Sequence, residues 1–340
     1  MQGERCEEES MNPNATSTSA SNETKQPVVI LVVGMAGTGK TTLVHALQNY
    51  ATGKGIRSYF INLDPAVASV PYRANIDIRD TVSYKEVMNS YRLGPNGAIM
   101  TSLNLFATKF NQVVSLLEKK EALEWIIVDT PGQIEVFTWS ASGQLIAESL
   151  AAVFPTIILF VADTTRCINP STFVSSMLYS SGIMLKQQLP LLLVFNKTDV
   201  VSADLVISWM RDNDALQEAV DLGSSGSLAG LPQGGCGSDG NVGVGGFGSG
   251  GGSYASTLAR SMSLFLHEFY ENIPYAAVSA STNAGLNELE AAIVRGKTQA
   301  VEENQRMREV ELQKKKEANE ANAARQIAAF QRDLGKGDHF

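Results

Sequence analysis

One stretch of the sequence decides the fold: residues 28–42, which read VVILVVGMAGTGKTT. The first six residues are all apolar, which is typical of a strand that is buried on both faces of a parallel sheet. Gly34 to Thr41 then follow the spacing G-x-x-x-x-G-K-T, in which backbone N–H groups of a glycine-rich loop surround phosphates and the next helix points its positive end at them. A strand–helix turn that binds nothing would not need this complete spacing. The stretch predicts an α/β protein with a phosphate-binding P-loop.

Each side chain of this loop is expected to contact a different phosphate or the metal ion. Lys40 should bridge the outer phosphates, and the hydroxyl of Thr41 is the expected direct ligand of a Mg²⁺ ion. Thr42 lies one residue further into the helix, where it would meet the inner phosphate. The residues predicted to hold the phosphates are Gly37, Thr38, Gly39, Lys40, Thr41 and Thr42.

Further short apolar runs alternate with helical patterns along the chain. Because these runs lack polar alternation, they predict strands buried on both faces, and hence a P-loop NTPase fold with a mostly parallel central sheet flanked by helices on both faces. The expected strands are Val28–Val33, Ser58–Ile61, Trp125–Val128, Thr156–Ala162, Leu191–Phe195 and Tyr275–Val278.

Composition divides the chain into three parts. Residues 1–26 are rich in Ser, Thr, Asn and Glu and lack apolar groups that would offset the entropy of ordering, so we expect them to be disordered. Residues 27–296 form the predicted domain, and residues 223–252, dominated by glycine and serine, read as a flexible insertion in it. Residues 297–340 mix basic and acidic side chains, which predicts a charged helical tail.

Charge and cysteine usage exclude several classes of protein. A net charge of -8 argues against direct binding of nucleic acid through a broad basic surface. The three cysteines are scattered, so neither a disulfide framework nor a zinc site is expected. The longest apolar stretch, residues 145–162, is interrupted by Glu148 and Pro155, and the acidic N-terminus lacks a signal-peptide core. We therefore predict a cytoplasmic protein that does not act at a membrane.

Two further strand ends carry candidate catalytic residues. The strand over residues 125–128 delivers Asp129, whose carboxylate could hold Mg²⁺ through water or orient the attacking water. Gly132 could donate its N–H to the γ-phosphate, and Gln133 is the natural candidate for positioning the nucleophilic water, against the plainer interpretation of a glutamine at a helix start. Asp64 follows another strand, at the same edge, and could be a second carboxylate near the metal.

Two more loops at this edge indicate which base is bound. Asn196-Lys197-Thr198-Asp199 follows an apolar strand, and the carboxylate of Asp199 can accept hydrogen bonds from both N1–H and the exocyclic amine of guanine, a donor pair that adenine lacks. The stem of Lys197 would cover the base plane while Asn196 ties loops together. Backbone N–H groups around Ser279 and Ala280 would face the guanine O6. Open α/β sheets bind ligands at such strand ends, so the motifs predict GTP.

Three functions are compatible with these motifs. The preferred one is a slow GTP hydrolase; the others are a P-loop phosphotransferase, such as a nucleoside or polynucleotide kinase, and a scaffold that binds GTP without turnover. The loop containing Asp199 counts against the kinase. Lys40, Thr41, Asp129 and Gln133 count against the scaffold.

The segment Gly94-Pro95-Asn96 would by itself be an ordinary turn. Together with the P-loop and the motifs at residues 62–66, 129–135 and 196–199, it resembles the GPN-loop GTPases over roughly residues 27–296, and residues 74–82, 94–97, 101–108 and 137–143 resemble the eukaryotic type-one branch. The glycine-rich insertion departs from a compact domain of that family.

The resemblance implies properties that spacing and composition do not give. It implies a dimer, with itself or with a paralogous GPN-loop GTPase, that opens and closes with nucleotide state. It further implies that Asn96 acts in trans on the phosphate intermediate of the dimer partner, by hydrogen bonding and water placement rather than by cancelling charge. It also implies work with RNA polymerase II subunits or assembly chaperones in polymerase assembly and nuclear import, by a protein that shuttles to the nucleus.

Overall fold

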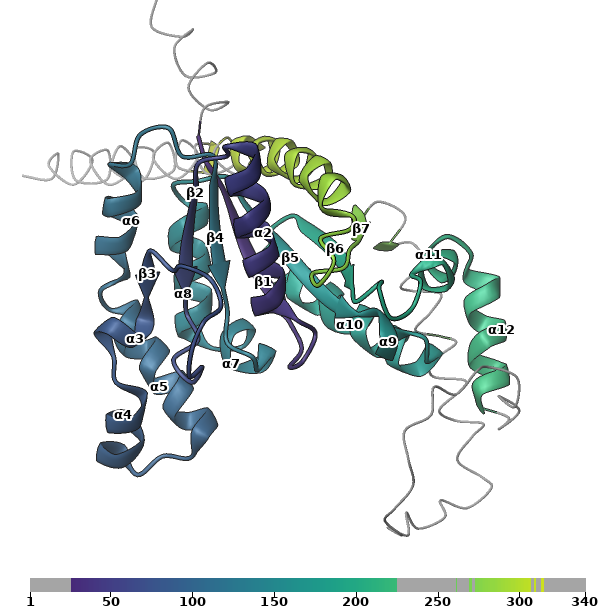
Figure 1. Ribbon diagram of the computed structural model, residues 1–340, viewed down its shortest axis with the longest axis horizontal. Helices are drawn as coiled ribbons and strands as arrows, with labels where there is room; N and C mark the ends of the chain where they lie inside the picture. Colours follow the sequence, from purple (N-terminus) through teal and green to yellow (C-terminus); the bar gives the residue numbers. More distant parts are fainter. Residues whose placement is uncertain are drawn as a thin grey trace, which may run out of the picture.

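A seven-stranded sheet organises the protein (Figure 1). The computed structural model describes residues 26–224, 261, 269–270, 273–306, 309 and 313–314. All neighbouring strands pair in parallel, in the order β3-β2-β4-β1-β5-β6-β7. The strands are β1 (Val28–Gly34), β2 (Ser58–Asn62), β3 (Ile76–Asp77), β4 (Trp125–Asp129), β5 (Thr156–Asp163), β6 (Leu191–Asn196) and β7 (Tyr275–Ala277).

The six strands expected from apolar runs are all present, and the fold class is confirmed. The seventh, β3, has two residues, too few for a hydrophobic pattern. It forms because the neighbouring Asn75 docks on β2: Phe60 N donates to Asn75 Oδ1, and Asn75 N donates to Phe60 O, each at 2.8 Å. These two hydrogen bonds precede the pairing of Ile76 and Asp77 with Ile61 and Asn62.

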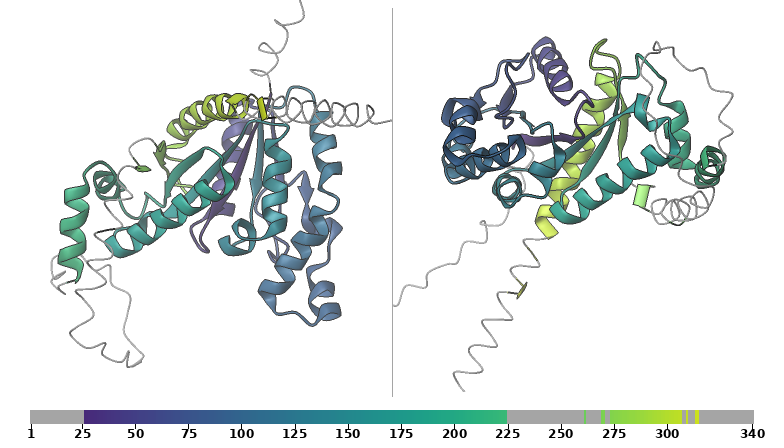
Figure 2. Two further views of the ribbon diagram at one scale, coloured as in Figure 1. Left: turned by 180° about the vertical axis from the view of Figure 1, so that it is seen from behind. Right: turned by 90° about the horizontal axis from the view of Figure 1, so that it is seen from below.

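Helices cover both faces of the sheet (Figures 1 and 2). One face packs against α2 and a helix over residues 286–306, through an apolar cluster that includes Leu43, Leu47, Leu289 and Ile293. The other, larger apolar cluster lies under the remaining helices. The helices are α2 (Lys40–Lys54), α3 (Ile78–Thr81), α4 (Tyr84–Tyr91), α5 (Pro95–Ala107), α6 (Phe110–Glu118), α7 (Ile134–Thr138), α8 (Ala141–Ala151), α9 (Thr164–Cys167), α10 (Pro170–Gln187), α11 (Asp204–Arg211) and α12 (Asn213–Ser224).

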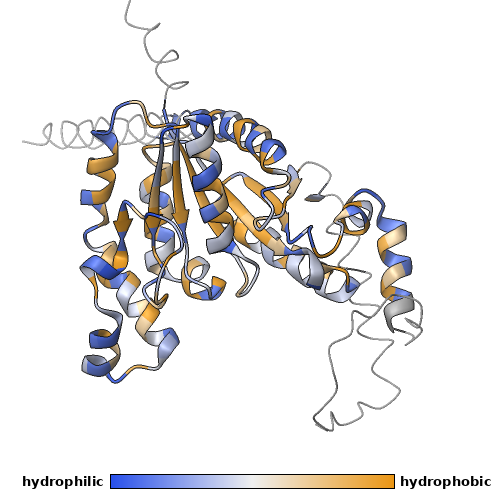
Figure 3. Ribbon diagram, in the orientation of Figure 1, coloured by the Kyte–Doolittle hydropathy of each residue, from blue (hydrophilic) through white to orange (hydrophobic). Residues whose placement is uncertain are grey.

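The central strands are apolar along their length, as Figure 3 shows. Every residue of β1, β4, β5 and β6 is buried, which is why their sequences lack polar alternation.

After β1 the chain crosses to β2 on one side, whereas β5 lies on the other side of β1. Open α/β sheets bind ligands where the strand order reverses in this way, and the P-loop follows β1 at that point.

Several sequence predictions fall beyond the described residues. These are the disordered segment 1–26, apart from residue 26, and the insertion 223–252, apart from residues 223–224. The helix over residues 286–306 continues through the boundary predicted at 296, so the start of the charged tail is part of the domain's last described helix. Within the described ranges, no helix combines the length and apolarity that a membrane crossing requires.

Candidate active site

The P-loop joins β1 to α2 and needs glycine at two positions. Gly37 and Gly39 have φ angles of 81° and 88°, in the left-handed region that favours glycine. A Cβ on Gly39 would also lie 2.6 Å from Asn196 Nδ2. That nitrogen donates to Thr38 O at 2.9 Å, so the amide of Asn196 crosses directly over the loop. The contact fastens the P-loop to the end of β6.

Lys40 is the first residue of α2 and is buried. Its Nζ donates to Gly34 O at 2.7 Å and to Met35 O at 3.0 Å, with Gly132 O at 3.4 Å. Burial lowers the pKa of Lys40, against the opposing effect of nearby carboxylates. The ammonium is therefore held by carbonyl groups of the loops where phosphate oxygens are expected. Thr41 is half-buried beside it, and Thr42 is exposed.

Asp129 ends β4 and is only 1% exposed. Its Oδ2 accepts a hydrogen bond from the hydroxyl of Tyr72 at 3.1 Å, while its Oδ1 has no partner among the described residues. Burial raises the pKa of Asp129 to about 6, although the hydroxyls of Thr41 and Tyr72 lower it. Burial and the charge of Asp129 also raise the pKa of Tyr72, so its hydroxyl keeps its proton and remains a donor.

These residues fit a Mg²⁺ ion held mainly by its nucleotide. A buried carboxylate oxygen without a partner needs a ligand, and Mg²⁺ is usually bound through one or two carboxylates together with phosphates and waters. No group of three or more His, Cys, Asp or Glu residues that could hold a metal occurs in the described part of the chain. Thr41 and Asp129 are thus the protein groups best placed to hold the ion.

Asp64 lies in the loop after β2 and contacts the loop after β4. Its Oδ1 accepts from Ala66 N at 2.9 Å, and its Oδ2 accepts from Gly132 N at 3.2 Å. The N–H of Gly132, expected to reach the γ-phosphate, is therefore occupied by a carboxylate. Gln133 follows as the N-cap residue of α7 and is half-buried, with its backbone starting the helix.

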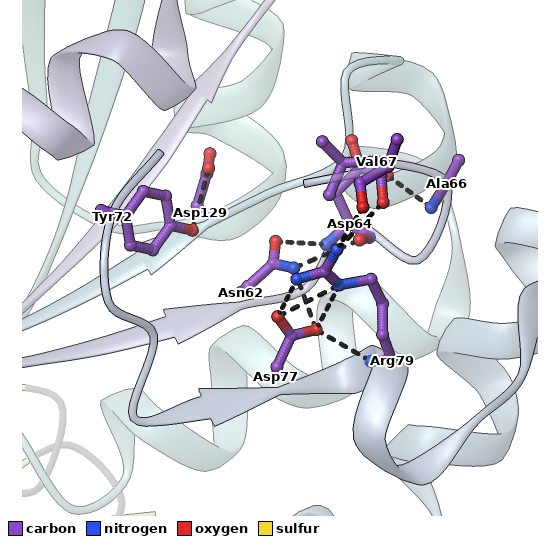
Figure 4. Close-up of polar contacts among 9 residues, drawn as sticks. Asn62, Asp64, Ala66, Val67, Tyr72, Asp77, Arg79 and Asp129 are labelled. Atoms are coloured by element: carbon purple, nitrogen blue, oxygen red, sulfur yellow. Dashed lines mark hydrogen bonds and ion pairs between the residues drawn. The ribbon is translucent and has the colours of Figure 1, made fainter. Parts of the chain in front are cut away.

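A network of polar contacts fixes the loop that carries Asp64 (Figure 4). Asn62 Oδ1 accepts from Asp64 N at 3.0 Å, and Asn62 Nδ2 donates to Asp77 Oδ1 at 3.1 Å. The guanidinium of Arg79 pairs with Asp77 at 2.7 Å and donates to the carbonyls of Val67 and Ala68 at 3.2 and 3.1 Å. The ion pair of Asp77 and Arg79 therefore holds this loop in place.

The ends of β5 and β6 meet the P-loop from the other side. Lys197 Nζ donates to Gly37 O at 2.9 Å and to Asp163 Oδ2 at 2.6 Å. Burial raises the pKa of Asp163, but hydrogen bonds from Lys197 and Thr165 to its carboxylate lower it more. The pKa of Asp163 therefore lies below its usual range. The ammonium of Lys197 thus links the P-loop to the end of β5.

Asp199 is exposed at the rim and is oriented by the loop after β7. Ser279 Oγ donates to Asp199 Oδ1 at 2.7 Å, and hydrogen bonds from Ser279 and Ser281 lower the pKa of Asp199. Ala280 N donates to Asn196 Oδ1 at 3.1 Å. The four residues Asn196, Asp199, Ser279 and Ala280 therefore form one connected unit, and in this chain the Ala280 N–H already has a partner.

The GPN segment lies apart from this cluster. Gly94 is the N-cap residue of α5, Pro95 is its first residue, and Asn96 is exposed. The turn between α4 and α5 projects beyond the edge of the sheet at which the P-loop lies (Figure 1). The contacts described above join the P-loop to the loops after β4, β6 and β7 and, through Gly132, to Asp64; they do not include Gly94, Pro95 or Asn96.

Sequence reasoning missed two residues of the site. Tyr72 lies in a segment without periodicity, between β2 and β3, so no pattern marks it. Asp163 does carry a signal, because it is the last residue of a buried strand that ends at the same edge as Asp129 and Asn196. Its pairing with Lys197 links the loop after β6 to the end of β5.

Comparison with known proteins gives the family context. A family model described as "conserved hypothetical ATP binding protein" matches residues 32–298. GPN-loop GTPase 1 of Schizosaccharomyces pombe is 42% identical over 315 residues, which cover 91% of this chain and 80% of that protein. GPN-loop GTPase 1 of Saccharomyces cerevisiae is 44% identical, covering 90% and 75%, and GPN-loop GTPase QQT2 of Arabidopsis thaliana is 49% identical, covering 75% and 60%.

A solved structure has the same fold. The crystal structure of a GTPase in apo form from Pyrococcus abyssi superposes with a TM-score of 0.61 and covers 79% of this chain and 97% of that one. Its sequence identity is 22%, so the likeness concerns the fold.

Proposed function

The chain belongs to the GPN-loop GTPase family, and from this premise we propose that it is a GTP hydrolase whose nucleotide state opens and closes a dimer. The observation that carries the nucleotide assignment is the connected unit of Asn196, Asp199, Ser279 and Ala280 at the rim. Ser279 donates to the carboxylate of Asp199, which would face the base, and Asn196 fixes the same unit to the P-loop. The phosphates and the purine are therefore bound by loops that are fastened to one another.

Guanine is favoured over adenine by the chemistry of this unit. The description of the matching family model mentions ATP, whereas the relatives above are named GTPases. A carboxylate at position 199 accepts two N–H donors from guanine, and its lowered pKa keeps it an acceptor at neutral pH. Adenine would present an acceptor at N1 to this carboxylate. We therefore assign GTP.

Hydrolysis requires placement and charge neutralisation more than covalent chemistry. Lys40 would exchange its carbonyl partners for the β- and γ-phosphates, and Gly132 would exchange Asp64 for the γ-phosphate.

Bound Mg²⁺ would neutralise charge on the β- and γ-phosphate oxygens. Asp129 and Thr41 would hold the ion, with Asp64 as the candidate second carboxylate. Gln133 would orient the attacking water.

A dimer would complete this site. Asn96 is the exposed second residue of α5, and the turn that precedes this helix projects beyond the edge of the sheet, where a second subunit could receive it (Figure 1). An asparagine offers one donor and one acceptor, which suit it to hydrogen-bond a phosphate oxygen and a water. We propose that the partner is a second copy or a paralogous GPN-loop GTPase.

The resemblance to type-one GPN-loop GTPases extends the proposal to clients. RNA polymerase II subunits or their assembly chaperones would bind according to the nucleotide state of the dimer, and the protein would act in the cytoplasm and shuttle to the nucleus. Affinity purification from cells with GTP or GDP present tests this part: polymerase subunits enriched in one nucleotide state support it, and their absence in both would overturn it.

The activity itself is tested by phosphate release. We expect purified protein with Mg²⁺ to release phosphate from GTP and not from ATP, without any acceptor. Transfer that depends on a nucleoside or polynucleotide acceptor would favour the phosphotransferase instead. Tight GTP binding with no turnover would favour the scaffold.

A further inference from the structure

Tyr72 places a hydroxyl group against the carboxylate of Asp129, inside the protein. The residue is 5% exposed and lies in the segment between β2 and β3. Its ring packs against Phe60, with ring centroids 6.0 Å apart, and it belongs to the apolar cluster beneath α2. Packing alone would be served equally well by phenylalanine. The hydroxyl is the feature to explain, because a buried polar group needs a partner.

That hydroxyl makes the two oxygens of Asp129 different (Figure 4). Oδ2 accepts from Tyr72 at 3.1 Å, whereas Oδ1 is buried and has no partner in the described part of the chain. The torsion of a carboxylate about its terminal bond is broad and roughly two-fold, so the Tyr72 hydroxyl adds to that of Thr41 in fixing the orientation of Asp129. With it, one oxygen is anchored and the other remains available for a ligand.

We propose that Tyr72 is a positioning residue for Mg²⁺, which holds the Asp129 carboxylate so that Oδ1 is presented to the metal or to its bound water. The proposal rests on the proposed function, since it assigns the ion to a nucleotide complex. Groups that orient a ligand in this way usually change metal affinity when they are removed. Tyr72 would also connect the segment after β2, which carries Asp64, to the metal.

The test compares Tyr72→Phe with the wild-type protein and with Tyr59→Phe. Tyr72→Phe keeps the ring against Phe60 and removes one oxygen. Tyr59→Phe removes a hydroxyl from β2. Tyr59 lies three residues before Asn62, the residue of β2 that is paired with Asp129 of β4. For each protein, the affinity for a fluorescent GDP analogue is measured in EDTA and during a Mg²⁺ titration, which gives a binding readout that is independent of hydrolysis.

Mg²⁺ is expected to increase the affinity for the analogue. We expect Tyr72→Phe to raise the Mg²⁺ concentration at which half of this increase is reached by roughly tenfold or more. Its affinity for the analogue in EDTA should equal that of the wild type, and Tyr59→Phe should behave like the wild type throughout. An unchanged Mg²⁺ titration for Tyr72→Phe overturns the role of Tyr72 while leaving the GTPase assignment intact. An equal loss of affinity in EDTA and in Mg²⁺ also overturns it, because the residue would then be structural. If Mg²⁺ does not change the affinity of the wild-type protein for the GDP analogue, the metal assignment itself is overturned.

Discussion

The carboxylate of Asp64 accepts a hydrogen bond from the backbone N–H of Gly132, with 3.2 Å between Oδ2 and N. The contact joins the loop after β2 to the loop after β4, and it uses the donor that a γ-phosphate is expected to take. We therefore predict that Asp64 and the γ-phosphate of bound GTP compete for one N–H group. Because Asn62 and Arg79 fix the loop around Asp64, displacement of its carboxylate would be transmitted to β3 and α3.

This competition predicts how Asp64→Asn behaves. Removing the charge should increase the affinity for GTP relative to GDP, because a carboxylate near the γ-phosphate repels it. Hydrolysis should fall by roughly tenfold or more, since a positioned carboxylate of this kind commonly contributes to proton transfer or water placement. Equilibrium binding of fluorescent GTP and GDP analogues, together with single-turnover hydrolysis, measures both effects. An unchanged GTP-to-GDP affinity ratio would contradict the competition.

Asp199→Asn should weaken the discrimination between guanine and adenine. The carboxylate accepts two donors, and the amide replaces one acceptor with a donor that faces N1–H. Sites that hydrogen-bond a substrate group discriminate by large factors, so we expect the GTP-to-ATP affinity ratio to fall by roughly 100-fold. Competition binding with both nucleotides gives the ratio. Ser279→Ala is the matched variant: it removes the hydroxyl that orients Asp199 and should cause a smaller change in the same direction.

The buried carboxylate of Asp129 predicts a pH dependence of stability without nucleotide. Burial raises its pKa from 3.8 to about 6, so the folded state stays protonated at a pH where the unfolded state ionises. Its stabilising contribution is complete below pH 4 and is lost as the pH rises to about 6, by on the order of 3 kcal/mol. Asp129→Asn should match the wild type near pH 4 and be more stable at pH 7. Chemical denaturation at both pH values in EDTA checks this, and equal stabilities at pH 7 would contradict it.

The sequence predicts those parts of the protein that depend on local pattern. The strand over Val28–Gly34 and the loop up to Thr41 are predictable because burial on both faces and phosphate wrapping impose a composition on consecutive residues. The loops after β4 and β6 are predictable for the same reason. Their convergence follows from the parallel sheet, which gathers the carboxyl ends of all its strands at one edge.

Other parts depend on contacts between distant residues and carry no local pattern. The edge strand β3 exists through the docking of Asn75 on Phe60, and Tyr72 reaches Asp129 across 57 positions of the chain. The hydrogen bond between Asp64 and Gly132 likewise joins loops 68 positions apart. In each case the partner could be found only from the three-dimensional structure. The predicted action of Asn96 cannot be derived from a local sequence pattern either, because it involves a second subunit.

The action of Asn96 in trans can be tested by mixing two inactive variants. Lys40→Ala should lose nucleotide affinity, because Lys40 supplies the charge expected to bridge the outer phosphates, yet it keeps an intact Asn96. Asn96→Ala should bind GTP normally, because the hydrogen bonds that hold the P-loop of its own chain do not include Asn96, and should lose turnover by roughly tenfold or more.

In a mixed dimer of these variants, the Lys40→Ala subunit would present its Asn96 to the intact nucleotide site of its partner. We therefore expect hydrolysis to recover in the mixture, toward half of the wild-type rate per mixed dimer, whereas neither variant recovers when it is mixed with itself. Phosphate release at a series of mixing ratios measures the recovery, and subunit exchange is followed with differently labelled chains. Exchange without recovery would show that Asn96 does not act across the dimer, because both required groups would then be present in one assembly and still fail to cooperate.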